Sequence, residues 1–223
     1  MKRTKIKDRE LPDYTKGEEI FNSSSHMVGD AFAVAALVVC VVVAAKNHNV
    51  WGIVSGAIYG STMILLYTMS SVYHALPPTK TSKKIFQVID HCTIFFFIAG
   101  TYTPITLCAV RLVNPTLAWT IFGVVWGLAI IGVILNAIDL KRFRIFSMIS
   151  YLGMGWCIMI VTKPMLQVIS LNCLLYLIFG GIAYTVGAIF YAIGKKSRYL
   201  HSTFHMFVLV GSILHFISVL YML

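Results

Sequence analysis

Seven stretches of apolar residues, each about 20 residues long, occupy most of this 223-residue chain. A helix of about 20 apolar residues crosses a hydrocarbon core of about 30 Å. Only 12% of the residues are charged, whereas soluble domains carry about 25%. The sequence therefore predicts an all-α protein of the cell membrane, a bundle of seven transmembrane helices over residues 24–45, 51–75, 86–109, 116–136, 145–163, 172–194 and 202–222.

Short connections join these stretches, and a polar, basic segment precedes the first of them. We expect a basic cytoplasmic N-terminal tail over residues 1–20 and a seven-helix transmembrane domain over residues 21–223. Proline cannot continue the hydrogen-bond ladder of a helix, so helix ends are expected at Pro77–Pro78, Pro104, Pro115 and Pro164. The five cysteines have no CxxC spacing, which favours reduced thiols over disulfides or a thiolate metal site.

Lysine and arginine divide unequally between the two sides that seven spans create. One side carries 15 of them and the other carries 3. Cytoplasmic loops of membrane proteins carry the excess of Lys and Arg, so we expect the N-terminus in the cytoplasm and the C-terminus outside. The net charge of +10 then indicates orientation and not a nucleic-acid partner. The cytoplasmic set is Lys2, Arg3, Lys5, Lys7, Arg9, Lys16, Lys80, Lys83, Lys84, Lys141, Arg142, Arg144, Lys195, Lys196 and Arg198.

Four ionisable residues fall at the cytoplasmic ends of the second, third and seventh stretches: His74, Asp90, His201 and His205. Ionisable groups in membrane helices are costly and mark functional sites. His201 and His205 are four residues apart, so their imidazoles share one helix face, a spacing that binds one metal ion. With His74 as third ligand, one position stays open for water, as in catalytic zinc sites. We therefore predict zinc as cofactor, bound by these three histidines.

Asp90 and Ser70 are the predicted catalytic residues. An aspartate beside the metal can bind it, hold its water or take a proton from that water, and the sequence leaves these alternatives open. Ser70 precedes His74 by one helical turn and shares its face. Its hydroxyl can donate a hydrogen bond to a developing oxyanion or to water.

Other polar residues near the spans have simpler interpretations. Glu19, Asn22 and His26 share one face at the start of the first helix. They are either a capping cluster near the helix dipole or support behind the metal ligands. His91 points about 100° away from its neighbour Asp90 and is expected to pack. His215 lies about 15 Å deeper than His205 by helix rise and is expected to bond another helix.

Four segments resemble the hemolysin III family, which is grouped with progestin and adipoQ receptors and alkaline ceramidases as seven-span membrane proteins proposed to be hydrolases. The resemblance covers essentially the whole chain. It implies zinc ligation by His74, His201 and His205, with Asp90 and Ser70 at the family's aspartate and serine positions. The segments are EEIFNSSSHMVG (18–29), SSVYHALP (70–77), DHCTIFFFIAGTYTP (90–104) and HSTFHMFVLVGSILHF (201–216).

Three classes of function follow. The first is a zinc-dependent hydrolase that cleaves an amide or ester bond in a lipid-like substrate at the cytoplasmic face; the resemblance suggests an acyl-amide lipid such as a ceramide. The second is a channel or pore-forming protein with structural zinc, although polar residues gather at one end and do not line a path. The third is a receptor or sensor, for which the short loops offer little surface. Membrane lipid is the expected partner, and the oligomeric state is open.

Overall fold

The computed structural model describes residues 3–194 and 197–223. Three basic residues used to predict the orientation, Lys2, Lys195 and Lys196, lie outside the described residues. The described part contains helices and no strand. The helices are η1 (Ile6–Asp8), α1 (Lys16–Lys46), α2 (Val50–Ala75), α3 (Thr81–Pro104), η2 (Ile105–Val110), α4 (Arg111–Val113), α5 (Pro115–Asp139), α6 (Arg144–Trp156), η3 (Cys157–Ile160), α7 (Thr162–Met165), α8 (Leu171–Ile193) and α9 (Leu200–Leu220).

Polar side chains at the first residues fix where several helices begin. At α1 the Thr15 hydroxyl accepts from the backbone N–H of Glu18, and the Glu18 carboxylate accepts from that of Thr15. This reciprocal pair satisfies N–H groups that a helix leaves free at its start. Three further helices, α2, α5 and α8, begin with a single side-chain cap of the same kind, from Asn49, Asn114 and Ser170.

Proline has a different effect at different helix ends. Pro77 and Pro78 follow α2, and Pro115 opens α5, as predicted. Pro104 does not end its helix, so that prediction was wrong: α3, η2 and α4 form one continuous segment of 33 residues, Thr81–Val113. A proline ring displaces the carbonyl one turn earlier, and the wider π-helical turns of η2 accommodate such a disruption without breaking the helix.

Six helical segments of the described chain are long and apolar enough to cross a membrane: α1, α2, α3 to α4, α5, α8 and α9. The chain is therefore a multi-pass integral membrane protein. The expected fifth stretch, 145–163, is shorter than the other six. Its apolar helix covers Arg144–Ile160 and changes from α6 to the 3-10 helix η3 at Cys157.

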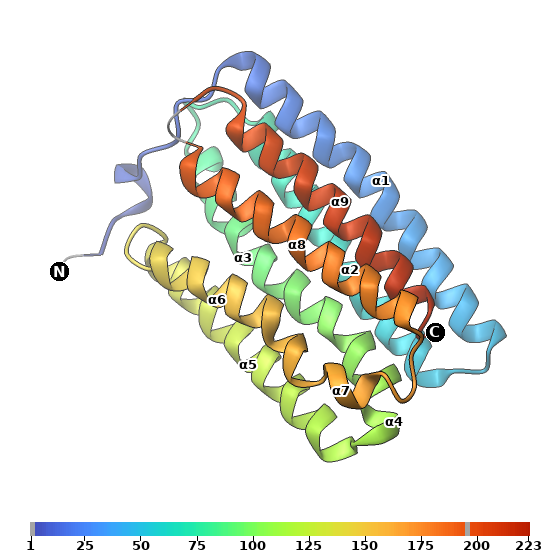
Figure 1. The fold of residues 1–223 in the computed structure, drawn as a ribbon. Helices are drawn as coiled ribbons and strands as arrows, with labels where there is room; N and C mark the ends of the chain where they lie inside the picture. Colours follow the sequence, from blue (N-terminus) through green and yellow to red (C-terminus); the bar gives the residue numbers. More distant parts are fainter. Residues whose placement is uncertain (1–2, 195–196) are drawn as a thin grey trace.

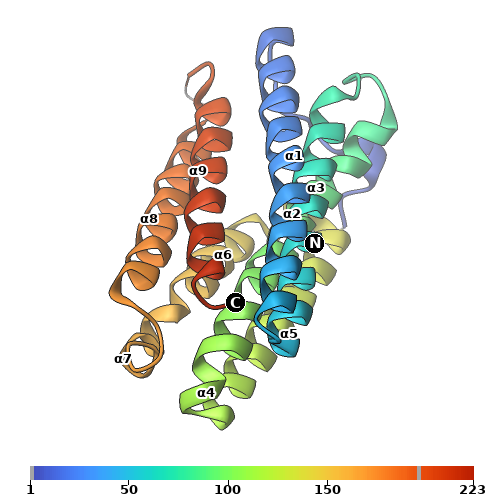
Figure 2. The same ribbon diagram turned by 90° about the vertical axis from the view of Figure 1, so that its right-hand side faces the viewer.

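The long helices form one bundle in which chain neighbours pack side by side (Figure 1). α3 packs against α2 and α5, and α8 packs against α9. The last long helix, α9, returns to α1, so that α1 contacts both α2 and α9 (Figure 2). The start of α1 and the C-terminus lie at opposite ends of the bundle (Figure 1). One end therefore collects the start of α1, the end of α2 and the starts of α3 and α9.

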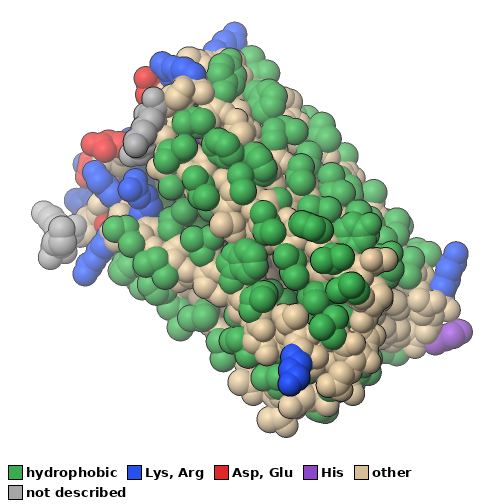
Figure 3. Space-filling model, viewed as in Figure 1, with side chains coloured by type: hydrophobic (Ala, Val, Ile, Leu, Met, Phe, Trp, Pro, Cys, Tyr) green, Lys and Arg blue, Asp and Glu red, His purple; other side chains and the backbone are tan. Residues whose placement is uncertain are grey.

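The surface of the bundle separates apolar and charged side chains. Hydrophobic side chains cover the middle of the visible face, and most of the visible Lys, Arg, Asp and Glu gather at the end where α1 begins (Figure 3). This arrangement is typical of a protein whose sides face lipid and whose charged end faces water. The predicted functional histidines belong to this charged end.

Candidate metal centre

Three histidines from two helices meet inside the charged end of the bundle. His74 lies in the last turn of α2, and His201 and His205 lie in the first two turns of α9. The Nε2 atom of His201 is 3.3 Å from that of His74 and 3.0 Å from that of His205. All three side chains are buried. The structure thus brings together the three predicted metal ligands, positioned to hold one metal ion.

The spacing of these nitrogens fits a tetrahedral zinc ion. Zinc binds imidazole nitrogen at about 2.0–2.1 Å, which places two nitrogens of a tetrahedron about 3.3 Å apart. The separations of 3.3 Å and 3.0 Å between the Nε2 atoms are close to that value. No cysteine joins the cluster in the described chain, and three nitrogens leave a fourth position open.

A carboxylate on α1 sets which nitrogen of His74 faces the cluster. Glu19 Oε2 lies 2.6 Å from His74 Nδ1. A carboxylate paired with a cation only accepts hydrogen bonds, so His74 Nδ1 carries the proton and donates it. His74 Nε2 is then a lone-pair donor directed at His201 and His205. Metal-bound histidines usually have such an oxygen partner behind them.

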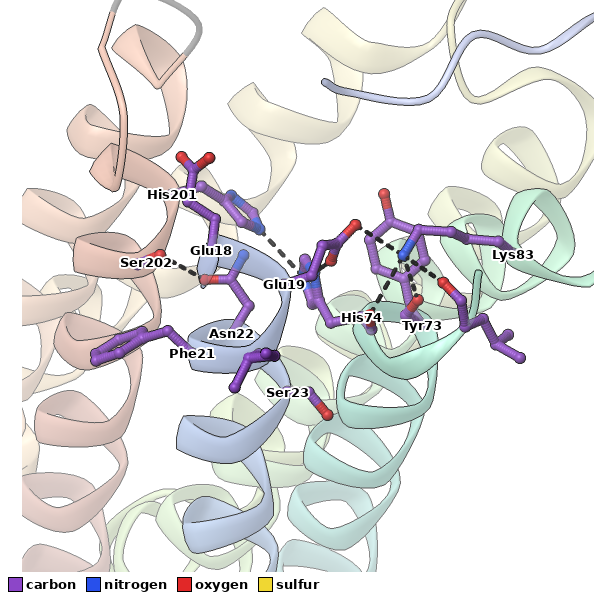
Figure 4. Close-up of polar contacts among 12 residues, drawn as sticks. Glu18, Glu19, Phe21, Asn22, Ser23, Tyr73, His74, Lys83, His201 and Ser202 are labelled. Carbon is purple, nitrogen blue, oxygen red and sulfur yellow. Dashed lines mark hydrogen bonds and ion pairs between the residues drawn. The ribbon is translucent and has the colours of Figure 1, made fainter. Parts of the chain in front are cut away.

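Two pairs of residues on α1 hold the histidine-bearing helices in place (Figure 4). Glu18 and Asn22 contact the α9 end: Glu18 Oε1 accepts from the Tyr199 backbone N–H at 2.8 Å, and Asn22 Oδ1 accepts from the Ser202 hydroxyl at 2.7 Å. Glu19 and Ser23 contact α2, where the Ser23 hydroxyl donates to the Ser71 carbonyl at 3.1 Å. Each pair is four residues apart and shares one helix face.

These contacts decide between the two readings of Glu19, Asn22 and His26. The capping acid is Glu18, whereas Glu19 and Asn22 contact α2 and α9 around the histidines. The His26 ring stacks on His205 with centroids 3.7 Å apart. The structure thus favours support of the histidine cluster over capping.

Lys83 is a buried residue that the sequence reasoning missed. The sequence predicts a cytoplasmic loop at this position, but Lys83 lies in the first turn of α3 with 1% of its side chain exposed. It pairs with Glu19 Oε1 at 2.8 Å. A basic residue in the first turn opposes the helix dipole, and that mismatch is the signal that identifies Lys83 as unusual.

The two predicted catalytic residues line the cavity next to the histidines. This cavity of about 180 Å³ is bordered by Ser70, Asp90, His201 and His205, and its wall continues over apolar side chains of α3, α6, α8 and α9. Ser70 is buried, and the Asp90 side chain is 13% exposed. Within the described chain, the Asp90 carboxylate has no hydrogen bond to another side chain; its Oδ2 lies 3.7 Å from Nδ1 of His91.

Aromatic rings cover the cluster on its outer side. The Tyr14 ring, in the segment before α1, stacks on His201 with centroids 4.9 Å apart and an interplanar angle of 19°. It also lies 5.8 Å from the His74 ring. Burial raises the pKa of Tyr14 above its usual value, so its hydroxyl stays neutral near the cluster. Tyr14 was missed because a single tyrosine in a polar tail carries no spacing signal.

His215 bonds another helix, as predicted, whereas His91 borders the cavity, with its Nδ1 3.7 Å from Oδ2 of Asp90. His91 Nδ1 donates to the Gln87 carbonyl at 2.8 Å, and its Nε2 accepts from the Tyr191 hydroxyl at 3.0 Å. His215 Nε2 donates to the Leu177 carbonyl of α8 at 3.1 Å. Both rings therefore bond to neighbouring groups of the bundle.

The chain is similar to known proteins over most of its length. The family model described as "Haemolysin-III related" matches residues 14–216. The "Hemolysin-3 homolog" of Bacillus subtilis is 40% identical over 93% of this chain and 95% of its own length. "Hemolysin-3" of Bacillus cereus is 37% identical over 92% and 91%. The human "Monocyte to macrophage differentiation factor" is 27% identical over 78% and 72%.

Proposed function

Because the chain belongs to the hemolysin III family and is a multi-pass integral protein of the cell membrane, we propose that it is a zinc-dependent hydrolase. Its substrate is a lipid-like molecule with an amide or ester bond, cleaved at the cytoplasmic face. The observation that carries the proposal is the meeting of three Nε2 atoms, 3.0 Å and 3.3 Å apart, beside a largely apolar cavity that His201 and His205 border.

The metal is proposed to be zinc, held by His74, His201 and His205. Zinc with three protein nitrogens acts as a Lewis acid toward a carbonyl and lowers the pKa of water. Asp90 borders the same cavity, and its carboxylate has no hydrogen bond to a described side chain, so it is suited to hold a water molecule and take its proton. Ser70 is suited to donate a hydrogen bond to the carbonyl oxygen of the substrate.

The rest of the cavity supports a lipid-like substrate. Beyond the histidines it is lined by apolar side chains of four helices, among them Ile94, Phe97, Leu177 and Val208. Apolar walls with a few polar groups at one end suit a ligand with a polar head and a hydrocarbon tail. The proposal therefore places the scissile bond near Asp90 and the tail along α3 and α8.

The activity test is an assay in reconstituted vesicles against acyl-amide and ester lipids. Wild type is expected to release fatty acid, and Asp90→Asn is expected to keep its metal but lose most turnover; Ser70→Ala should reduce turnover less. Protein that hydrolyses nothing while vesicles leak ions in proportion to its amount would overturn the enzyme in favour of a pore with structural zinc. Asp90→Asn protein that loses its zinc would make the aspartate a direct ligand of a closed site.

The membrane orientation is part of the same proposal. We propose seven crossings, with the segment Arg144–Ile160 as the fifth, a cytoplasmic N-terminal tail and an outer C-terminus. At about 1.5 Å per residue, the 17-residue segment from Arg144 to Ile160 spans about 25 Å, short of an average hydrocarbon core but within reach of a locally thinned one. Reporter fusions at both termini test this proposal: reporters on the same side contradict an odd number of crossings.

A further inference from the structure

Lys83 is placed where a lysine is costly unless something requires it. Its side chain is 1% exposed, and burying an ammonium is unfavourable unless it is paired and hydrogen-bonded. Lys83 Nζ donates to the carbonyls of Tyr73 at 3.0 Å, His74 at 3.3 Å and Leu76 at 2.9 Å. Tyr73 and His74 belong to the last turn of α2 and Leu76 directly follows it, where a helix end leaves carbonyls without partners.

The same ammonium is joined to the side chain of His74 through Glu19. One carboxylate oxygen of Glu19 lies 2.8 Å from Lys83 Nζ, and the other lies 2.6 Å from His74 Nδ1. Figure 4 shows Glu19 reaching from α1 to the space between His74 and Lys83. One buried cation therefore contacts both the backbone of His74 and the carboxylate that orients its ring.

We propose that Lys83 is a positioning residue that acts through Glu19 to fix His74 as a metal ligand. Without the ammonium, the last carbonyls of α2 lose a donor and the Glu19 carboxylate can rotate away from His74. The ring of His74 would then sample orientations in which Nε2 no longer faces His201 and His205. This inference rests on the proposed metal site and adds a connection among α1, α2 and α3 that sets its affinity.

The test measures zinc affinity directly, in purified protein in detergent, by competition with a chromophoric chelator. Lys83→Met and Glu19→Gln are each expected to weaken zinc binding by about 10- to 100-fold. The double variant should bind no more weakly than Glu19→Gln alone, because the lysine acts through the carboxylate. Lys84→Met is the matched control: Lys84 is the next residue, is only partly buried, and donates to the Lys7 carbonyl instead of to Glu19 or α2.

A purely structural role gives a different pattern. It lowers the unfolding temperature of the metal-free Lys83→Met protein and leaves zinc affinity at the wild-type value, which would overturn the inference. If Lys83→Met does not fold, Glu19→Gln decides, because it leaves Lys83 its three carbonyls. In the cobalt-substituted protein the visible spectrum should change for both variants and not for Lys84→Met. Wild type that binds no zinc would instead refute the proposed metal site itself.

Discussion

Two polar clusters lie inside this bundle, and they differ in whether the protein alone satisfies them. The deeper cluster centres on Ser212 of α9. Its hydroxyl donates to the Val208 carbonyl at 3.0 Å and accepts from the hydroxyls of Tyr67 at 2.8 Å and Tyr184 at 2.9 Å. A serine hydroxyl has one donor and two acceptor positions, so all three positions of Ser212 are used.

The outer cluster, about two turns earlier on α9, is different. Its three imidazoles point Nε2 atoms at one another, and the Glu19 contact leaves His74 Nε2 without a proton. Two Nε2 atoms at these separations repel each other if both present lone pairs, so a shared proton or a metal ion has to lie between them. The comparison teaches that burial of polar groups alone does not identify a binding site, whereas donors and acceptors that the protein leaves unmatched do.

The largest expected effect is on zinc content, which should depend on the histidines of the outer cluster. Wild type purified without chelator should carry about one zinc per chain, and His205→Ala should carry almost none, because two imidazoles bind zinc much more weakly than three. His215→Ala removes another histidine of α9, one that is partly buried, and is the matched control. Elemental analysis of the three proteins measures the difference. Equal zinc in wild type and His205→Ala would remove His205 from the site.

The second largest effect is expected when zinc is removed from wild type, which should lower its stability. A ligand present at about 1,000 times its dissociation constant stabilises the folded state by about 4 kcal/mol. We therefore expect chelation to lower the unfolding temperature of wild type by several degrees and to leave His205→Ala unchanged. Thermal unfolding followed by circular dichroism measures both. A matching decrease in His205→Ala would show that the chelator acts elsewhere.

In the deeper cluster, Ser212→Ala should lower the free energy of unfolding without changing the amount of zinc bound. It leaves the buried Tyr67 hydroxyl and the partly buried Tyr184 hydroxyl without their acceptor, at a cost of about 1–3 kcal/mol. Zinc content and zinc affinity should equal those of wild type. Denaturant unfolding and metal analysis of the same preparation check the two halves of the prediction. Loss of zinc in Ser212→Ala would mean that the clusters are coupled and the contrast between them is wrong.

The smallest effect is expected for Tyr59→Phe. The Tyr59 hydroxyl is 3.4 Å from the Ser212 carbonyl, a long contact, and a hydrogen bond of ordinary geometry contributes only about 1 kcal/mol. The substitution should therefore change stability by less than about 1 kcal/mol. Comparison with Tyr67→Phe, whose hydroxyl bond is 2.8 Å long, sharpens the result, since the shorter bond should cost more to lose.

Features that depend on neighbouring residues along the chain could be predicted from the sequence. Apolar stretches predicted the membrane helices, and the four-residue spacing of His201 and His205 predicted that both lie on one face of α9. The bonding of His215 to another helix also followed from its depth. The fifth stretch is the exception, because its helix changes to 3-10 geometry at Cys157 although its composition resembles that of the other six.

Features that depend on how helices rotate and pack could not be predicted. Hydropathy and spacing say at which level a side chain lies, and they leave open which neighbouring helix it faces. Pro104 lies within a continuous helix because π turns follow it, and Lys83 is buried because the end of α2 and Glu19 of α1 surround its ammonium.

The sequence by itself determined the membrane helices, the level of His74, His201 and His205, and their chemical suitability for a metal ion. Only the tertiary structure decided that their Nε2 atoms converge within 3.0 Å and 3.3 Å and that Glu19 orients His74. The physical reason is that residue type and helical periodicity are local properties. Convergence of nitrogens from α2 and α9 requires the rotation and separation of helices, which packing against α1 and α3 sets.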